Sequence, residues 1–186
     1  RRVCLFGPES TGKSSLSARL AAHFRTVAVP DHARVLLERQ GGQVVRDDIE
    51  RIARGQLAAE DALARSANRV LFCDTDALTT RIWSEALFGE CPAWIVEESE
   101  RRRYDVTLLC DVDVPWVWDE IRYLPDNRGE FFDRCERALV STGRRFIRIH
   151  GDWDERFARA LEAVAAIDPR LPMSAPVNAR STREPP

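Results

Sequence analysis

Short apolar runs alternate along the chain with longer segments in which apolar residues recur at helical spacing. The apolar runs predict five β-strands, at residues 3–6, 26–29, 70–73, 106–110 and 146–149. After the first run, Leu16, Leu20 and Phe24 recur at i, i+4 and i+8, which predicts a helix. Similar spacing predicts further helices at 32–40, 47–68, 77–88, 93–102 and 129–141, and from Trp153 to Val164.

This alternation of strands and helices predicts the α/β fold class. Consecutive strands that are separated by a helix are joined by crossovers, so the sheet should be parallel. The strands are apolar at successive positions rather than at every second one, which indicates that helices cover both faces of the sheet. We therefore expect one five-stranded parallel sheet between two layers of helices.

The chain has 186 residues and changes character near its end. Residues 168–186 hold five of the ten prolines, and the apolar periodicity stops there. We expect one domain over residues 1–167, followed by a proline-rich, disordered tail over residues 168–186.

Composition narrows the classes of partner. The 28 basic and 30 acidic residues give a net charge of −2, so no basic excess indicates nucleic-acid binding by this domain. No apolar stretch approaches the roughly 18 residues needed to span a membrane, and no signal peptide opens the chain, so the cytoplasm is the expected location. The five cysteines form no C-x-x-C pair, and we interpret them as reduced thiols.

A phosphate-binding motif lies between the first predicted strand and the first predicted helix. Residues 7–14 read Gly-Pro-Glu-Ser-Thr-Gly-Lys-Ser, the pattern G-x-x-x-x-G-K-[ST]. Lys13, the only lysine of the chain, should reach the β- and γ-phosphates of ATP, and the Ser14 hydroxyl should bind Mg²⁺. The predicted ATP contacts are Gly7, Pro8, Glu9, Ser10, Thr11, Gly12, Lys13, Ser14 and Ser15, with Gly151 and Trp153 beside the adenine.

Acidic residues follow the third predicted strand. Asp74 ends that strand, as the Walker B carboxylate does, and should hold Mg²⁺ together with Ser14. Asp76 is predicted to face the same cleft and contact the substrate, or else to cap the next helix.

Several classes of P-loop protein can be set aside. The guanine-reading Asn-Lys-x-Asp motif needs a second lysine, which the chain lacks. Gly41-Gly42-Gln43 lies too far ahead of Asp74 to be the signature of an ABC ATPase, and too few residues follow Asp74 for the helical lid domain of an AAA+ motor. A small-molecule or nucleotide kinase remains.

Such a kinase needs a lid, an acceptor pocket and a base. Arginines neutralise the transferring phosphoryl group in these enzymes, and Arg122, Arg128 and Arg134 are candidates, with a solvated helix face as the alternative. Asp31 follows the second strand, where it can orient or deprotonate an acceptor hydroxyl or simply cap the next helix; Asp74 or Asp76 would be the base otherwise. The other predicted acceptor contacts are Arg34, Trp83, Trp94 and Asp119.

Several motifs together resemble one kinase family. They are residues 7–14, Asp-Ile-x-x-Ile-Ala-Arg-Gly-Gln at 48–56, Phe-Cys-Asp-Thr-Asp at 72–76, and Asp-Val-Pro-Trp at 113–116 with Asp119 and Arg122. They are similar to the ribosylnicotinamide kinase domain of the NadR type, over about residues 2–160. The resemblance implies ATP-dependent phosphorylation of the 5′-hydroxyl of nicotinamide riboside, giving nicotinamide mononucleotide. It also implies an upstream adenylyltransferase domain in many full-length members.

The chain departs from that family at three positions. Asp31 stands where the family usually has Glu, Leu36 where an aromatic residue is usual, and Glu120 where Gly is usual. We therefore expect a P-loop kinase fold with sheet order 2-3-1-4-5 and an arginine-containing lid, ATP and Mg²⁺ as cofactors, and a nucleoside-like substrate. A kinase for another nucleoside or small alcohol, and an ATP-binding regulatory module, remain as alternatives.

Overall fold

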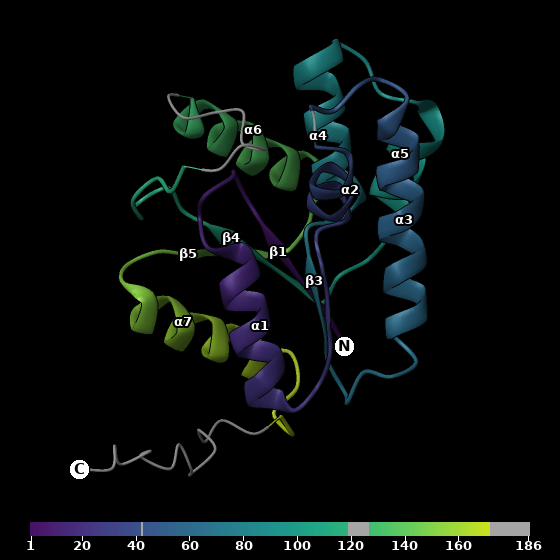
Figure 1. The fold of residues 1–186 in the computed structure, drawn as a ribbon. Helices are drawn as coiled ribbons and strands as arrows, with labels where there is room; N and C mark the ends of the chain where they lie inside the picture. The colour runs from purple at the N-terminus through teal and green to yellow at the C-terminus, as the bar shows by residue number, and fades with distance from the viewer. Residues whose placement is uncertain (42, 119–126, 172–186) are drawn as a thin grey trace, which may run out of the picture.

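The computed structural model describes residues 1–41, 43–118 and 127–171. Within them, strands and helices alternate as the apolar pattern predicts (Figure 1). In chain order the elements are β1 (Arg2–Phe6), α1 (Lys13–Phe24), β2 (Ala28–Val29), α2 (His32–Gln40), α3 (Asp48–Leu63), β3 (Leu71–Asp74), α4 (Ala77–Phe88), α5 (Ala93–Arg101), β4 (Val106–Cys110), α6 (Arg128–Ser141), β5 (Phe146–Ile149) and α7 (Trp153–Ala165).

The five strands form one sheet in the order β2-β3-β1-β4-β5, and every neighbouring pair is parallel. This confirms the predicted fold class and strand order. The strand β1 lies at the centre, between β3 and β4, and it is fully buried from Val3 to Phe6. A strand that is covered on both faces can be apolar at every position, which explains its uninterrupted apolar run.

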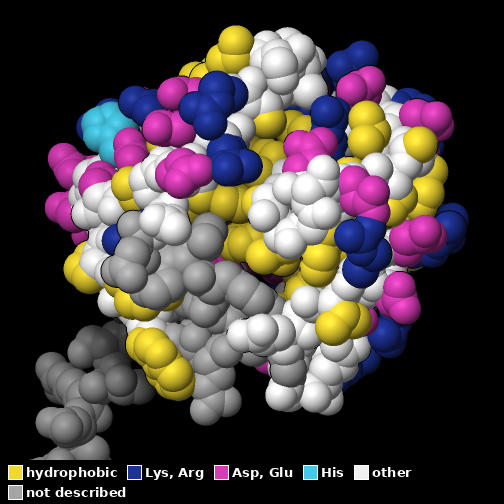
Figure 2. Space-filling view, turned by 90° about the horizontal axis from the view of Figure 1, so that it is seen from above, with side chains coloured by type: hydrophobic (Ala, Val, Ile, Leu, Met, Phe, Trp, Pro, Cys, Tyr) yellow, Lys and Arg dark blue, Asp and Glu magenta, His cyan; other side chains and the backbone are white. Residues whose placement is uncertain are grey.

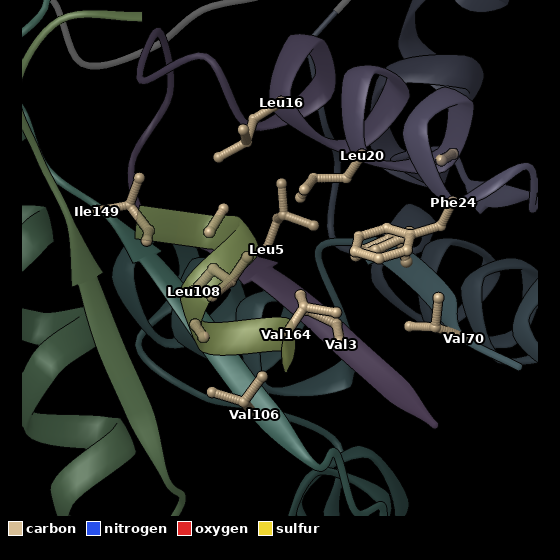
Figure 3. Close-up of a cluster of buried hydrophobic side chains, with 14 of the residues drawn as sticks. Val3, Leu5, Leu16, Leu20, Phe24, Val70, Val106, Leu108, Ile149 and Val164 are labelled. Carbon is tan, nitrogen blue, oxygen red and sulfur yellow. The ribbon is translucent and has the colours of Figure 1, made fainter. Parts of the chain in front are cut away.

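Helices cover both faces of the sheet, as predicted. On one face α1 and α7 lie side by side (Figure 1), and Val3 and Leu5 of β1 pack against them. Figure 3 shows Leu16, Leu20 and Phe24 of α1 pointing into this cluster, so the i, i+4, i+8 stripe is the buried face of the helix. On the opposite face Cys4 and Phe6 of β1 pack with residues of α4 and α6.

Two predicted segments are shorter in the structure. Of the strand predicted at 26–29, only Ala28–Val29 pairs, because the Thr26 backbone amide instead donates to the Ala21 carbonyl of α1 at 2.9 Å; the Thr26 hydroxyl donates to the Val70 carbonyl at 2.7 Å. The helix predicted at 47–68 ends at Leu63, and the chain then turns into β3 through Arg69, whose φ is +67°.

The first residues of the predicted tail pack on the domain. Leu171 is 4% exposed and belongs to the cluster beneath α1 and α7, so the packed chain extends past residue 167. The rest of that prediction, at 172–186, lies outside the described residues.

In a parallel sheet the carboxyl ends of all strands meet at one edge. The loops that follow β1, β2, β3, β4 and β5 therefore gather there. These loops carry the predicted phosphate-binding motif, Asp31, Thr75, Asp113 and Gly151, so the fold brings residues that are far apart in sequence to one site.

Candidate nucleotide and acceptor site

The loop between β1 and α1 has the backbone that its glycines predict. Gly7 has φ +127° and Gly12 has φ +77°, a region that other residues rarely adopt. A Cβ on Gly7 would lie 2.7 Å from the Cys110 carbonyl oxygen, and a Cβ on Gly12 would lie 2.4 Å from the Trp153 ring. Gly7 therefore needs glycine both for its conformation and for the space beside a backbone atom, whereas at Gly12 the conformation decides, because the exposed Trp153 ring can move.

The loop holds the Lys13 ammonium group within it. Lys13 is the first residue of α1, and its Nζ donates to the Pro8 carbonyl at 2.6 Å. The Thr11 hydroxyl donates to the same carbonyl at 2.8 Å. The positive charge therefore stands over the amino terminus of α1, where backbone N–H groups also favour an anion.

Ser14 and Asp74 form a pair at the base of the loop. The Ser14 hydroxyl donates to Asp74 Oδ2 at 2.5 Å, which joins the start of α1 to the end of β3. Asp74 is 3% exposed, and burial raises the pKa of its carboxyl, whereas Lys13 and the bond from Ser14 oppose that rise. Its buried Oδ1 has no hydrogen-bond partner within the described part of the chain.

This oxygen set fits Mg²⁺. The ion prefers hard oxygen ligands and takes one or two carboxylates beside phosphate oxygens and water. Ser14 Oγ and the Asp74 carboxylate are such ligands, and the orphaned Oδ1 gives a buried carboxylate an acceptor that a cation would satisfy.

Asp31 both caps a helix and faces the phosphate-binding loop. Its Oδ1 accepts from the amides of Ala33 at 3.0 Å and Arg34 at 3.4 Å, which makes it the N-cap of α2. Burial and the neighbouring Asp74 carboxylate raise its pKa to about 6, and Lys13 opposes this. The two carboxylates and the ammonium group thus lie close enough to influence one another.

Lys13, Ser14 and Asp31 line one cavity of about 350 Å³, whereas Asp74 reaches it only through its bond from Ser14. The phosphate-binding loop lines one end, and residues from the β2–α2 loop, α2, α3 and α4 line the other. Of the predicted contacts it includes Gly7, Glu9, Ser10, Thr11, Gly12, Lys13, Ser14, Ser15, Asp31, Arg34 and Trp83. Figure 2 shows one face of the molecule hollowed near its centre, with hydrophobic side chains around the hollow.

The cavity is also lined by residues that the site predictions did not include. The apolar ones are Ala33, Leu37, Val44, Ile49, Ile52 and Leu87, and the polar ones are Gln56, Thr75, Thr79 and Thr80. Ile49 and Ile52 belong to the apolar stripe of α3, which pattern alone assigns to a core. A residue on such a stripe looks the same in sequence whether it faces a core or a cavity.

Gln56 ties together the two loops that carry the carboxylates. It is 1% exposed, and its Oε1 accepts from the His32 amide at 3.0 Å while its Nε2 donates to the Thr75 carbonyl at 3.4 Å. The sequence could have indicated Gln56, because it is the last residue of the motif at 48–56. Gly55, just before it, leaves room for the His32 ring.

Two predicted acceptor contacts lie away from the cavity lining. Asp76 is fully buried, caps α4 by accepting from the Thr79 amide at 3.0 Å, and pairs with Arg144. Trp94, on α5, packs on Ile49, Ala53 and Ile95, so it lies behind the wall of the cavity. The structure thus gives Asp76 the capping position that the sequence left as its alternative.

The predicted lid is described only in part. Asp119 and Arg122 lie outside the described residues. Arg128 begins α6, and its Nη1 donates at 3.1 Å to the carbonyls of Ser10 and of Val114. Arg134 pairs with Glu130 at 2.9 Å on an exposed helix face, the alternative stated for it above.

The segment after β5 lies against the phosphate-binding loop. The Trp153 ring stands against Gly12 and is 52% exposed, so one of its sides is open to solvent. The Gly151 amide donates to Asp113 Oδ2 at 2.6 Å. Trp153 therefore lies beside the phosphate-binding loop and Gly151 beside the loop after β4, and their contact with adenine stays a prediction.

The class of protein follows from this geometry. A glycine-rich loop runs from the central strand into a helix, a carboxylate ends the neighbouring strand, and the sheet has the order 2-3-1-4-5. These features define a P-loop nucleotide-binding domain.

The chain belongs to the AAA_28 family, described as an AAA domain, which it matches over residues 2–156. An AAA+ motor carries a helical lid domain in addition to the domain that holds the sheet. Within the residues described, α7 is the one helix after β5. Membership in this family is therefore compatible with a single α/β domain.

Curated relatives carry the NadR name. The chain is 31% identical over 171 residues to the trifunctional NAD biosynthesis/regulator protein NadR of Escherichia coli K12, and 30% identical to that of Salmonella typhimurium LT2. Each alignment covers 88% of this chain but 42% of the relative. The chain thus spans less than half the length of these proteins.

Solved structures show the same fold. A NadR protein in complex with NR has a TM-score of 0.75 at 23% identity, and one with NAD and AMP-PNP has 0.71 at 22%; each match covers 90% of this chain and 49% of the other. Thymidylate kinase from Ehrlichia chaffeensis has 0.59 at 16% identity, over 89% of this chain and 97% of the enzyme.

Proposed function

We propose that this domain is an ATP-dependent kinase that phosphorylates the 5′-hydroxyl of nicotinamide riboside and releases nicotinamide mononucleotide. The observation that carries the proposal is the cavity lined by Lys13 and Ser14 at one end and by Asp31 on the facing wall, with the buried Asp74 bonded to Ser14 behind that end. The NadR relatives support it, since their name includes NAD biosynthesis and one related structure is a complex with NR.

The residues of the phosphate-binding loop would bind and orient ATP. Phosphoryl transfer depends mostly on positioning and charge neutralisation, because the bond changes occur between substrate atoms. Lys13 supplies a positive charge at the β- and γ-phosphates, and Ser14 with Asp74 would hold Mg²⁺, which neutralises charge on the phosphates when bound. Arg128 fixes the loop through the Ser10 carbonyl, and Arg122 is the predicted donor of the lid.

Asp31 is the proposed acceptor residue. With a pKa near 6 it is ionised at neutral pH, so it can accept a hydrogen bond from the incoming hydroxyl and take its proton. Both backbone bonds that cap α2 go to Oδ1, so Oδ2 is the oxygen that we assign to the incoming hydroxyl.

The wall opposite the phosphates suits a flat, positively charged ring. Trp83 lines it together with aliphatic side chains, and aromatic faces attract cations at close range. Nicotinamide riboside carries such a ring, whereas a small alcohol would leave the apolar wall unfilled. This favours a nucleoside over the second candidate acceptor, a small alcohol.

Release of ADP tests the proposal directly. The protein is incubated with ATP and Mg²⁺, alone and with nicotinamide riboside, uridine, cytidine, adenosine or glycerol, and Lys13→Ala serves as background. We expect ADP release that depends on nicotinamide riboside and equals the nicotinamide mononucleotide formed. Release with a different nucleoside would identify another kinase, and slow hydrolysis regardless of the additive would indicate the regulatory module.

Three further expectations accompany the proposal. The Mg²⁺ requirement rests on Ser14 and Asp74, and the cytoplasmic location rests on the sequence. No helix within the described ranges is long and apolar enough to cross a membrane. An upstream adenylyltransferase domain in the full-length protein is a prediction from the resemblance to NadR.

A further inference from the structure

We propose that Arg156 is a positioning residue for ATP, which holds the phosphate-binding loop, the end of β4 and the loop after β5 in one arrangement. The inference rests on the proposed function only in assuming that ATP binds at this loop. Arg156 lies on α7 and is 1% exposed, although arginine is rarely buried so completely. No part of the mechanism above uses it.

The guanidinium group reaches three backbone carbonyls from three different loops. Nη1 donates to Thr11 in the phosphate-binding loop at 3.0 Å, Nη2 to Asp111 after β4 at 3.0 Å, and Nε to Gly151 after β5 at 2.9 Å. Bonds to carbonyl oxygens fix the backbone itself. One planar side chain therefore sets the relative position of three segments that surround the nucleotide.

An acidic partner completes the network. Asp113 pairs with Nη2 of Arg156 and accepts the Gly151 amide through its other oxygen. Burial acts to raise the pKa of Asp113, but the bonds from Gly151 and Arg156 outweigh burial and lower it, so the carboxylate is ionised at neutral pH. The charge of the buried guanidinium is thereby matched, as a buried charge requires.

The same network lies next to the Trp153 ring, which packs beside the phosphate-binding loop. Trp153 precedes Arg156 on the first turn of α7, with 5.9 Å between the Arg156 Cζ and the ring centroid. The same ring lies against Gly12. Displacement of the Thr11 and Gly151 backbones would therefore alter both the phosphate cradle and the predicted adenine contact, while Asp31 and the acceptor wall lie on other elements.

Lysine cannot replace this arginine. A guanidinium group offers five donors in a rigid plane, whereas an ammonium group is a point charge with a shorter reach. Arg156→Lys keeps the positive charge next to Asp113 but cannot bond three carbonyls in one plane. This variant separates positioning from charge.

The test compares Arg156→Lys with Arg102→Met in the full chain. Arg102 is also nearly buried, but it pairs with Glu60 and Asp61 at the opposite edge of the sheet, so it controls for lost stability alone. The readouts are the ADP dissociation constant by calorimetry, the KM values for ATP and for nicotinamide riboside, kcat, and the Tm.

For Arg156→Lys we expect ADP affinity and KM for ATP to worsen roughly tenfold, because displaced binding groups far from the chemistry can cost up to about a hundredfold. The KM for nicotinamide riboside should stay within about twofold, and Arg102→Met should lower the Tm while leaving the ADP affinity intact. Parental ADP affinity in Arg156→Lys overturns the proposal, and so does an equal loss in Arg102→Met.

Calorimetry with ADP needs no acceptor, which keeps this inference separate from the proposed function. If the parent binds ADP but does not phosphorylate nicotinamide riboside, the proposed function fails and the Arg156 comparison still gives an answer. Arg156→Lys is a better test than Arg156→Met, which leaves the buried Thr11 carbonyl and the half-buried Asp111 and Gly151 carbonyls without this donor and can prevent folding.

Discussion

Replacing Asp31 by asparagine should make the protein more stable and less active. Asparagine is as good an N-cap as aspartate, so its side-chain oxygen can keep the bonds from the Ala33 and Arg34 amides. What the variant loses is a negative charge that is partly buried beside Asp74. The activity loss and the stability gain would then have one physical cause.

The raised pKa of Asp31 sets the size of the expected gain in stability of Asp31→Asn. A rise from 3.8 to about 6 corresponds to at most about 3 kcal/mol of penalty for the ionised form, at 1.36 kcal/mol per pKa unit. Asp31 keeps some contact with solvent, so we reduce this to about 1–2 kcal/mol. For a domain of this size, the expected rise in Tm is about 3–6 °C at pH 7.5.

The direction in which the stability of the parent changes with pH follows from proton binding by Asp31. Between pH 3.8 and about 6 the folded protein holds the Asp31 proton more tightly than the unfolded chain does. The parent therefore loses stability as the pH rises through this window, and the penalty is complete above it. The difference in Tm between variant and parent should be full at pH 7.5 and shrink as the pH falls toward 4.

The activity of the parent should rise with pH over the same range in which its stability falls. If Asp31 takes the proton of the acceptor hydroxyl, kcat/KM of the parent should fall on the acid side with a midpoint near pH 6. Asp31→Asn should lack that limb and turn over about 10²–10³-fold more slowly, with unchanged ADP affinity. The assays are thermal unfolding of the ligand-free protein and ADP release, both from pH 4.5 to 8.

Two results would refute this reasoning. Parental activity in Asp31→Asn would leave Asp31 as a helix cap only, and the base would have to be Asp74 or another group. A lower Tm at pH 7.5 would show that the Asp31 charge stabilises the fold, which contradicts the origin assigned to its raised pKa.

The remaining predictions concern four other positions. Lys13→Ala should abolish ADP release with little change in Tm, because Nζ contacts a loop carbonyl rather than the core; an unchanged rate would contradict the P-loop assignment. Asp74→Asn should shift the Mg²⁺ dependence of the rate to higher concentration, which Asp31→Asn should not do. Arg122→Ala should lower kcat about 10²-fold with little effect on ATP affinity, and a pure KM effect would place it in ground-state binding. Gln56→Leu should lower the free energy of unfolding in urea by roughly 2–4 kcal/mol and raise the acceptor KM, because the buried Thr75 carbonyl and the half-buried His32 amide lose their partner. Parental values would show that Gln56 does not hold the two loops together.

The sequence was sufficient for the fold because its signals are local and agree with one another. The apolar run Val3 to Phe6 and the stripe Leu16, Leu20 and Phe24 each identify an element, and the crossovers make the sheet parallel. The phosphate-binding loop was predictable for a similar reason, since its glycines and Lys13 are neighbours in sequence. Contacts between distant segments have no such signal, and Arg156 with its three carbonyls is the clearest example.

In the Asp-Thr-Asp segment, two carboxylates that were both predicted to face one cleft have different environments. Asp74 ends β3 and faces the phosphate-binding loop, where it meets Ser14. Thr75 then adopts a left-handed φ of +69°, which no sequence pattern announced, and the chain turns so that Asp76 caps α4. The Asp76 side chain there pairs with Arg144, a residue 68 positions later in the chain. Asp76 thereby fixes the first turn of α4, and with it the threonines that line the cavity, so it affects the acceptor wall from behind while Asp74 faces the phosphates.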